Sequence, residues 1–350
     1  MPSDTTTTTP PTSGTTGGNA PTTPPATTPP TATTPRNGVG QHTRCGWINS
    51  PEGYDTFAAH PTEFEAIHPK WHVMQPDGSL RNAGRTNDAA TRAAARAANV
   101  AVIPLIDEDR DKARLRRMLA TPESRAAHIA AIMKAVTDND YDGIDIDYES
   151  LWAAEDRPTF NAFMRDLGAA LHAAGKELSM AIPAISEGGA DGYDYTALAA
   201  LCDPIHVMGY DFHWLGGDHV GPLAPLGWID AVFARAQATG HPERFILGVA
   251  NYAIGNGFYA STREALTMCT GAVATKTEHM ASCGYGHFDA GRATHCDTAK
   301  GVLWFDDLAA IEERIIAAKS HGARGVTYWT VGDELDGYFE MVRRYYPSSK

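Results

Sequence analysis

The amino-acid sequence predicts an α/β fold, a (β/α)8 barrel of the TIM type with a small lobe inserted after the seventh strand. From residue 44 onward, short apolar runs rich in β-branched residues alternate with Ala-rich stretches of helical composition. Such alternation favours a parallel sheet covered by helices. Eight strand-like runs share about three hundred residues, which suits a closed barrel better than an open sheet.

The expected elements follow in order along the chain, and helical stretches separate most of the strands. The expected strands are residues 45–49, 71–74, 100–106, 143–147, 178–184, 205–211, 245–250 and 325–330. Helices are expected at residues 88–98, 123–138, 157–174, near 195–202, near 228–239 and at 306–320. Active sites of such barrels lie at the carboxyl ends of the strands.

One interruption, residues 251–304, is too long for a plain loop between a strand and a helix. We expect it to form the inserted lobe over the C-terminal face of the barrel. It holds Cys269, Cys283 and Cys296, whereas Cys45 and Cys202 are expected to be free inside the barrel.

The cysteine trio has two interpretations. Histidines at positions 279, 287 and 295 lie between the cysteines, so a structural zinc site is conceivable. No C-x2-4-C pair is present, however, and the spacing suits a disulfide that staples a loop. We therefore expect one disulfide within the trio, and the spacing leaves open which two cysteines pair.

The N-terminal segment differs from the rest in composition. Its first 36 residues hold fifteen Thr and nine Pro with hardly any large apolar side chain, so they cannot bury enough surface to fold. Residues 1–38 are expected to be a disordered tether, and residues 39–350 one catalytic domain. Thr/Pro tethers are typical of exported proteins, which favours a secreted or cell-envelope-attached protein over a cytoplasmic one with a frayed end.

The charge pattern excludes some classes of function. The net charge is −13 and the pI about 5.5, without any Lys/Arg-rich run, so a role in nucleic-acid binding is not expected. No apolar run is long enough to span a membrane. We expect a monomer that needs no cofactor and no metal.

The stretch "YDGIDIDYES", residues 141–150, puts carboxylates into a strand that is otherwise rich in Ile. Side chains alternate between the faces of a strand, so Asp145, Asp147 and Glu149 share one face. The two Ile residues and Tyr148 take the other face, which would pack on helices. The carboxylates are therefore expected to point into the barrel and to climb towards its C-terminal mouth.

Buried carboxylates cost several kcal/mol each unless they are paired or protonated. No Lys or Arg is nearby in the sequence, so the acids are expected to share protons, which raises the pKa of at least one of them. A carboxylic acid that stays protonated near neutral pH can serve as a general acid. A Ca²⁺ or Mg²⁺ site and a purely structural network are the alternatives, but the spacing does not match an EF-hand loop.

These residues carry a resemblance. "DGIDIDYE" (142–149) matches the D-G-x-D-x-D-x-E signature of glycoside hydrolase family 18, the chitinase and endo-β-N-acetylglucosaminidase family. "MGYDF" (208–212) and "YWTVGDE" (328–334) resemble its sixth and last strands. "WHVMQPDGSL" (71–80) and "VLWFDDLAAIEERI" (302–315) resemble its bacterial branch of spore-germination hydrolases. The likeness covers residues 44 to about 345.

The resemblance implies a retaining hydrolysis of β-1,4 bonds next to N-acetylglucosamine, without an enzyme nucleophile. Glu149 would protonate the glycosidic oxygen and then activate water. Asp147 would orient the acetamido N–H and stabilise the oxazolinium ion, and Asp145 would hold or share a proton with Asp147. Tyr210 would hydrogen-bond the acetamido carbonyl, while Trp329 would stack under the sugar.

Other residues receive lesser assignments. Four are expected to line the cleft: Met208, Asp211, Trp214 and Tyr252. Asp142 is expected to support the start of its strand, and His206 and His213 to be structural. The family often has an S-x-G-G motif on its third strand, which "VAVIPLIDED" (100–109) lacks, so nothing on that strand is assigned a role.

The leading hypothesis is a glycosidase that cuts polymers containing N-acetylglucosamine, such as chitin. An N-acetylglucosaminidase that acts on peptidoglycan glycan strands would use the same chemistry. A non-catalytic chitin-binding lectin on the same barrel belongs to a different class. Such relatives typically lose the signature Glu, and Glu149 is present.

Overall fold

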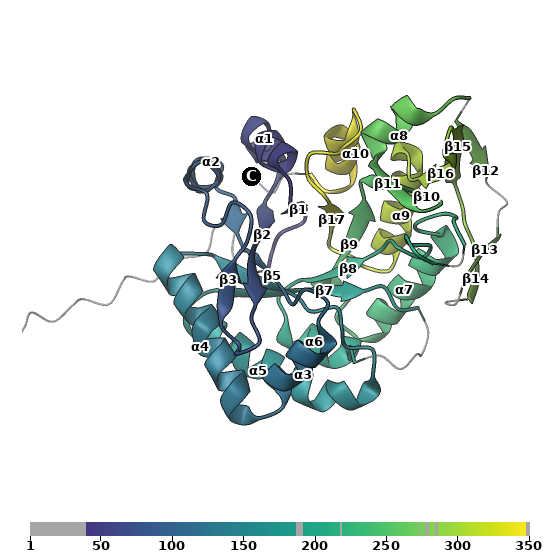
Figure 1. Cartoon of the computed structure of the whole chain (residues 1–350). Helices are drawn as coiled ribbons and strands as arrows, with labels where there is room; N and C mark the ends of the chain where they lie inside the picture. The colour runs from purple at the N-terminus through teal and green to yellow at the C-terminus, as the bar shows by residue number, and fades with distance from the viewer. Residues whose placement is uncertain are drawn as a thin grey trace, which may run out of the picture. The chain divides into compact units, whose positions relative to one another are not determined.

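The computed structural model describes residues 40–186, 192–217, 219–271, 273–276, 280–283 and 286–347 (Figure 1). The expected tether, residues 1–38, lies outside the described residues. Among the described residues, no helix is both long and apolar enough to cross a membrane.

Eight parallel strands form the barrel, which confirms the predicted fold class. They pair in the order β1 (Cys45–Ile48), β2 (Ala66–Met74), β5 (Leu105–Asp107), β6 (Gly143–Asp147), β7 (Glu177–Pro183), β8 (Ile205–Met208), β9 (Phe245–Ala250) and β17 (Gly325–Trp329). A parallel bridge between Arg44 and Val326 joins the ends of this order, and the Val331 N–H donates to the Trp47 carbonyl at 2.9 Å. These contacts bring β17 against β1.

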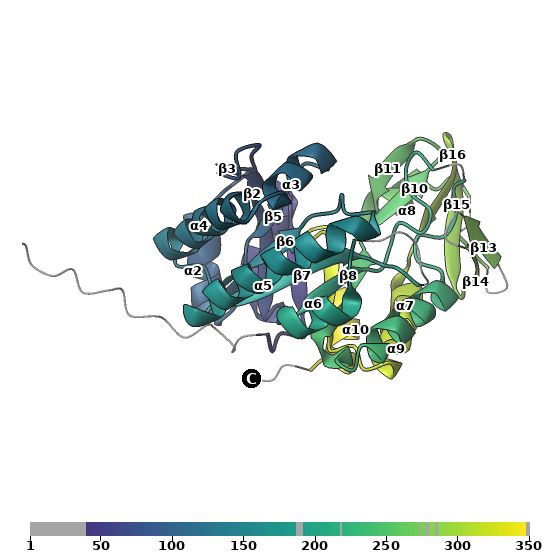
Figure 2. The same cartoon turned by 90° about the horizontal axis from the view of Figure 1, so that it is seen from below.

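Helices lie around the outside of the sheet (Figures 1 and 2). They are α1 (Pro51–Ala59), α2 (Ala89–Ala98), α3 (Lys112–Leu119), α4 (Pro122–Asn139), α5 (Arg157–Ala173), α6 (Tyr195–Leu201), α7 (Leu226–Ala238), α9 (Leu308–Ser320) and α10 (Tyr338–Tyr345), with short 3-10 turns at Pro61–Glu63, Ala154–Asp156 and Pro242–Arg244. The sequence did not predict α1, α3 or α10. Helix α1 lacks an Ala-rich pattern, and its start depends on the Ser50 side chain, which accepts from the Gly53 N–H.

Three strands differ clearly from their expected bounds. Strand β8 ends at Met208, whereas it was expected to run to residue 211. The run expected at 100–106 is split into β4 (Ala101–Val102) and β5, because Pro104 has no N–H to donate to the ladder. Strand β2 begins at Ala66, five residues before the expected start, and a short strand, β3 (Leu80–Asn82), pairs with its end. Asp142 supports the start of β6 as expected, because its carboxylate accepts from the Val102 N–H at 2.8 Å.

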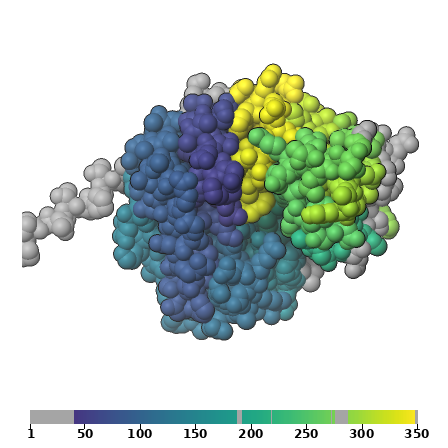
Figure 3. Space-filling view, turned by 45° about the horizontal axis from the view of Figure 1, so that its top comes forward, coloured from purple at the N-terminus to yellow at the C-terminus, as the bar shows by residue number. Residues whose placement is uncertain are grey.

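The inserted lobe follows β9 and is built on an antiparallel sheet. The sheet order is β11 (Phe258–Ser261), β10 (Tyr252–Gly255), β16 (Gly301–Phe305), β15 (Ala293–Thr298) and β12 (Ala274–Lys276), with α8 (Thr262–Met268) beside it and a hairpin of β13 (Met280–Cys283) and β14 (Gly286–Asp289). In the space-filling view, the green lobe and the purple-to-blue N-terminal segments face each other across a hollow (Figure 3).

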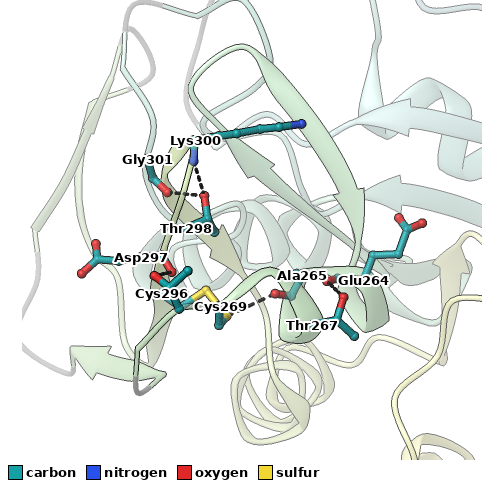
Figure 4. The surroundings of a disulfide bond; sticks show 10 residues. Glu264, Ala265, Thr267, Cys269, Cys296, Asp297, Thr298, Lys300 and Gly301 are labelled. Atoms are coloured by element: carbon teal, nitrogen blue, oxygen red, sulfur yellow. Dashed lines mark hydrogen bonds between the residues drawn. A yellow bond between two sulfur atoms is a disulfide. The ribbon is translucent and has the colours of Figure 1, made fainter.

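A disulfide joins Cys269 to Cys296 and ties the end of α8 to β15 (Figure 4). This confirms the expected single bridge and decides the pairing. The bridge uses two thiols that the alternative zinc site would have needed. The Cys283 side chain and His279 lie outside the described residues. Cys45 and Cys202 are free and buried, as predicted.

We expect the Cys269→Ser, Cys296→Ser double variant to lose about 3–4 kcal/mol of unfolding free energy, because the bridge closes a loop of 27 residues. Denaturant unfolding of the variant beside the wild type measures this loss. Peptide mapping without reductant should recover a Cys269–Cys296 cross-link. A cross-link that includes Cys283 instead would contradict the pairing.

Candidate active site

The carboxylates of β6 form a column from the barrel interior to its C-terminal mouth. Asp145 is fully buried, Asp147 is 6 % exposed, and Glu149, just beyond the end of the strand, has a side chain that is 26 % exposed. On the opposite face, Tyr148 is fully buried and packs against Phe163 of α5 at 6.2 Å between ring centroids. The alternation within this one strand therefore points the acids into the barrel and Tyr148 into the apolar layer between the sheet and the helices.

Asp145, the innermost acid, has three neighbours from other strands. The Trp47 indole N–H donates to its Oδ2 at 2.9 Å and the Ser179 hydroxyl donates to its Oδ1 at 2.7 Å. His68 Nδ1 lies 3.6 Å from Oδ2. Burial raises the pKa of Asp145, and these neighbours oppose the rise.

Asp147 is the least compensated of the three acids. Its Oδ1 is buried and has no hydrogen-bond partner within the described part of the chain. Burial raises its pKa well above the ordinary value, and the charges of Glu149, Asp107 and Glu108 raise it further. Asp147 is thus suited to hold a proton that it can share with a neighbouring group.

The Glu149 carboxyl lies near other carboxylates and near the Arg110 guanidinium. Burial raises its pKa, the Arg110 guanidinium opposes this effect from 3.3 Å, and the charges of Asp107 and Asp211 add to the rise. The outer acid therefore stays protonated to higher pH than an exposed glutamate, as a general acid requires.

Two residues that follow the third expected strand lie beside Glu149, and the sequence analysis did not predict them. Glu108, which follows β5, accepts from the Glu149 N–H at 2.9 Å and the Ser150 hydroxyl at 2.7 Å, and burial raises its pKa to about 7. Arg110 follows in the same loop. The acidic run "DED" (107–109) at the end of this strand is the sequence signal for these neighbours.

The acids were expected to share protons, because no Lys or Arg lies near them in the sequence. The fold, however, brings cations to them from other segments. Arg110 pairs with Glu149, and the Lys70 ammonium of β2 forms an ion pair with Asp107. Ion pairs with cations from other segments therefore compensate part of the negative charge at this site.

A cleft of about 850 Å³, its open mouth included, lies over the column. Seven of the predicted site residues line it: Asp147, Glu149, Met208, Tyr210, Asp211, Tyr252 and Trp329. Asp145 lies below the cleft lining. Trp214 is 40 % exposed and is not part of this lining.

Aromatic side chains make much of the cleft wall. The Tyr210 and Tyr252 rings meet edge to face at 6.0 Å between centroids, and the Tyr252 hydroxyl donates a hydrogen bond to Asp211. Tyr259 of β11 also lines the cleft and was not predicted. The lobe therefore supplies part of the wall, through β10 and β11.

The two histidines expected to be structural are both buried. His213 Nδ1 lies 2.8 Å from the Pro222 carbonyl, which holds the loop after β8. His206 lies inside the barrel beside His68 and is not part of the cleft lining.

The family model for Glycosyl hydrolases family 18 matches residues 57–334, most of the described chain. The chain belongs to this family. Among curated relatives, the putative sporulation-specific glycosylase YdhD of Bacillus subtilis is 32 % identical over 139 residues, which cover 39 % of this chain and 33 % of that protein. The cortical fragment-lytic enzyme of Bacillus anthracis is 25 % identical over 206 residues, 54 % of this chain and 46 % of that protein. The chain thus spans less than half the length of either.

Solved structures show the same fold. A chitinase from Chromobacterium violaceum superposes with a TM-score of 0.74 at 18 % identity, over 88 % of this chain and 99 % of that one. The Bacillus cereus spore cortex-lytic enzyme SleL gives 0.73 at 18 % identity, over 86 % and 73 %. The family-18 member described here therefore has the fold of both chitinases and cortex-lytic enzymes.

Proposed function

We propose that this family-18 glycosidase cleaves β-1,4 bonds in polymers that contain N-acetylglucosamine, such as chitin, with retention of configuration. The observation that carries the proposal is the column of Asp145, Asp147 and Glu149, whose pKa values are all raised by burial and whose outer end opens into an aromatic-walled cleft. Such a wall suits the apolar faces of sugar rings.

In the proposed reaction, Glu149 gives its proton to the glycosidic oxygen and afterwards takes one from water. The acetamido oxygen of the substrate attacks the anomeric carbon and forms an oxazolinium ion. Asp147 accepts a hydrogen bond from the acetamido N–H, for which its unpartnered Oδ1 is available. Asp145, held by Trp47 and Ser179, shares a proton with Asp147.

The cleft wall positions the sugar in this proposal. Tyr210 donates a hydrogen bond to the acetamido carbonyl. Trp329 stacks under the ring, and it is itself held edge to face against Trp47 at 6.2 Å. Met208, Asp211 and Tyr252 line the same space. A lectin on this fold has no need of a carboxylic acid with a raised pKa at the cleft, so Glu149 favours the enzyme.

Arg110 favours a second candidate substrate, the glycan strands of peptidoglycan. It is the one Lys or Arg among the described cleft-lining residues, and its side chain is 75 % exposed. Muramic acid residues carry a lactyl carboxylate, which a guanidinium can bind in bidentate fashion. The names of the Bacillus relatives point to spore and cortex substrates, and an envelope-attached or secreted location would suit this substrate as well as chitin.

Product analysis on chitin oligomers beside purified peptidoglycan tests the proposal. We expect release of N-acetylglucosamine-containing fragments from at least one of the two, with the anomeric configuration retained in the first product. Cleavage of peptidoglycan alone would select the second candidate. Products of inverted configuration would contradict the proposed mechanism.

Arg110→Gln should move the alkaline limb of the kcat/KM profile to higher pH. Arg110 lowers the pKa of Glu149, so its removal raises that pKa, and the catalytic acid stays protonated to higher pH. The difference from the wild type should shrink in high salt, because Arg110 is exposed and its charge is screened. Arg96→Gln is the matched control, an exposed arginine of α2 that pairs with Asp140. A limb that moves to lower pH would contradict the assignment.

A further inference from the structure

A cluster of three side chains inside the barrel has no part in the proposed reaction. Cys45 of β1, His68 of β2 and His206 of β8 are all fully buried. The Cys45 sulfur and one nitrogen of each ring lie within 4.8 Å of one another. The two imidazole rings approach to 4.5 Å between centroids. Three side chains that can each ligate a metal therefore converge on one small volume.

The polar atoms of this cluster are poorly satisfied within the described part of the chain: His68 has only a weak contact with the Ile103 backbone and the Asp145 carboxylate at 3.6 Å. Both ring nitrogens of His206 and both ring nitrogens of His68 lack a hydrogen-bond partner of ordinary geometry among the described residues. Cys45 is not part of a disulfide. Buried polar atoms without partners are destabilising, and native proteins satisfy most of them with protein, water or ions. The cluster is thus suited to an occupant.

The charges around the cluster favour a cation as that occupant. An imidazole offers one ring nitrogen to a metal through its lone pair, and the two rings place such a nitrogen near the Cys45 sulfur. The carboxylates of Glu177 and Glu65 lie near enough to the Cys45 thiol to act on it electrostatically. The same carboxylates attract a positive ion.

Glu177 keeps its negative charge inside the barrel. Burial alone would raise its pKa, but His42, 2.9 Å away, and the Gly40 N–H outweigh burial and lower the pKa. Asp145 lies 3.6 Å from His68 Nδ1. A carboxylate beside a metal-binding histidine, as Asp145 lies beside His68, orients the imidazole ring and makes it a stronger ligand.

We propose that Cys45, His68 and His206 form a binding site for a zinc ion. Thiolate and imidazole are the ligands that zinc prefers, whereas Mg²⁺ and Ca²⁺ require oxygen ligands. On binding, the Cys45 thiol gives its proton to solvent and the sulfur bonds to the ion, so one proton is released for each zinc bound. The three side chains leave the fourth position of a tetrahedral zinc ion to a water molecule. None of the three lines the cleft, but His206 contacts Trp47 and His68 lies beside Asp145.

The burial of the three ligands indicates at which stage of folding the metal binds. All three side chains are buried, so zinc should bind as the barrel closes and exchange slowly afterwards. Because the ion binds the folded chain and not the unfolded one, it should raise the midpoint of thermal unfolding. Neither property depends on glycosidase activity. The zinc site can therefore be absent while the proposed function holds, and the proposed function can fail while zinc binds.

Refolding from guanidinium under anaerobic conditions, with zinc or with chelator, tests the site. After gel filtration, elemental analysis should find one zinc per chain in the wild type refolded with zinc. Cys202→Ser, which changes the other buried free cysteine, is the matched control and should keep the metal. Cys45→Ser and His206→Gln should lose it, together with the gain in unfolding temperature.

Cobalt gives a readout that does not require a variant to fold. Wild-type protein refolded with Co²⁺ should show a thiolate-to-cobalt charge-transfer band and the visible absorption of a tetrahedral complex. Wild-type protein that stays metal-free after refolding with either ion would overturn the proposal and would indicate that buried water satisfies the histidines. Bound cobalt without the thiolate band would also overturn it.

Discussion

Glu149→Gln should lower turnover by at least about 10²–10⁴-fold, the usual contribution of a positioned general acid. The substitution keeps the shape of the side chain and removes the proton that the leaving group needs. Folding should be unaffected, because the Glu149 side chain is partly exposed. The Glu149 backbone N–H donates to the Glu108 carboxylate, and this hydrogen bond does not involve the Glu149 side chain.

The measurement is the initial rate on chitin oligomers and on peptidoglycan, beside a thermal unfolding curve for each protein. Glu155→Gln is the matched control, since Glu155 lies on the same segment and pairs with Arg116 on the surface. It should retain wild-type turnover. Near-normal turnover of Glu149→Gln with both substrates would remove Glu149 from its assigned role.

The second large effect should come from the acetamido group of the substrate. Oligomers that are de-acetylated at the residue to be cleaved should not be cut, because a free amine cannot form the oxazolinium ring. A thiazoline analogue should inhibit at least about 10²-fold better than the matching plain sugar, since preorganised groups bind transition-state mimics tightly. Inhibition constants for the two compounds, measured side by side, provide the comparison.

Asp147→Asn separates this mechanism from a covalent one. The variant should lose both turnover and the preference for the thiazoline, because Asp147 is placed to stabilise the charged ring. The plain sugar should bind it almost as before. A covalent glycosyl adduct on Asp145, Asp147 or Glu149, found by mass spectrometry, would refute the substrate-assisted mechanism while leaving the fold and the family unchanged.

The order of the barrel strands and the column of acids follow from local rules. Eight apolar runs separated by helical stretches leave few arrangements other than a closed parallel barrel, and each run supplied one of its strands, although the run at 100–106 is interrupted and also gives β4. Within β6, the two-residue period alone places Asp145, Asp147 and Glu149 on one face and Tyr148 on the other. Local elements with weak patterns, such as α1 and α10, escaped this reasoning because packing and single caps decide them.

The surroundings of the acids were decided only when the barrel closed. Trp47 and Ser179 reach Asp145 from β1 and β7, Arg110 reaches Glu149 from the loop after β5, and His68 and His206 meet across the interior. No pattern within a window of the sequence reports such pairs, because they are separated by tens of residues and joined only by the curvature of the sheet. The sequence thus determined which acidic side chains the site carries. The tertiary structure decided the charge states of these side chains, because burial and distant partners set the pKa of each one.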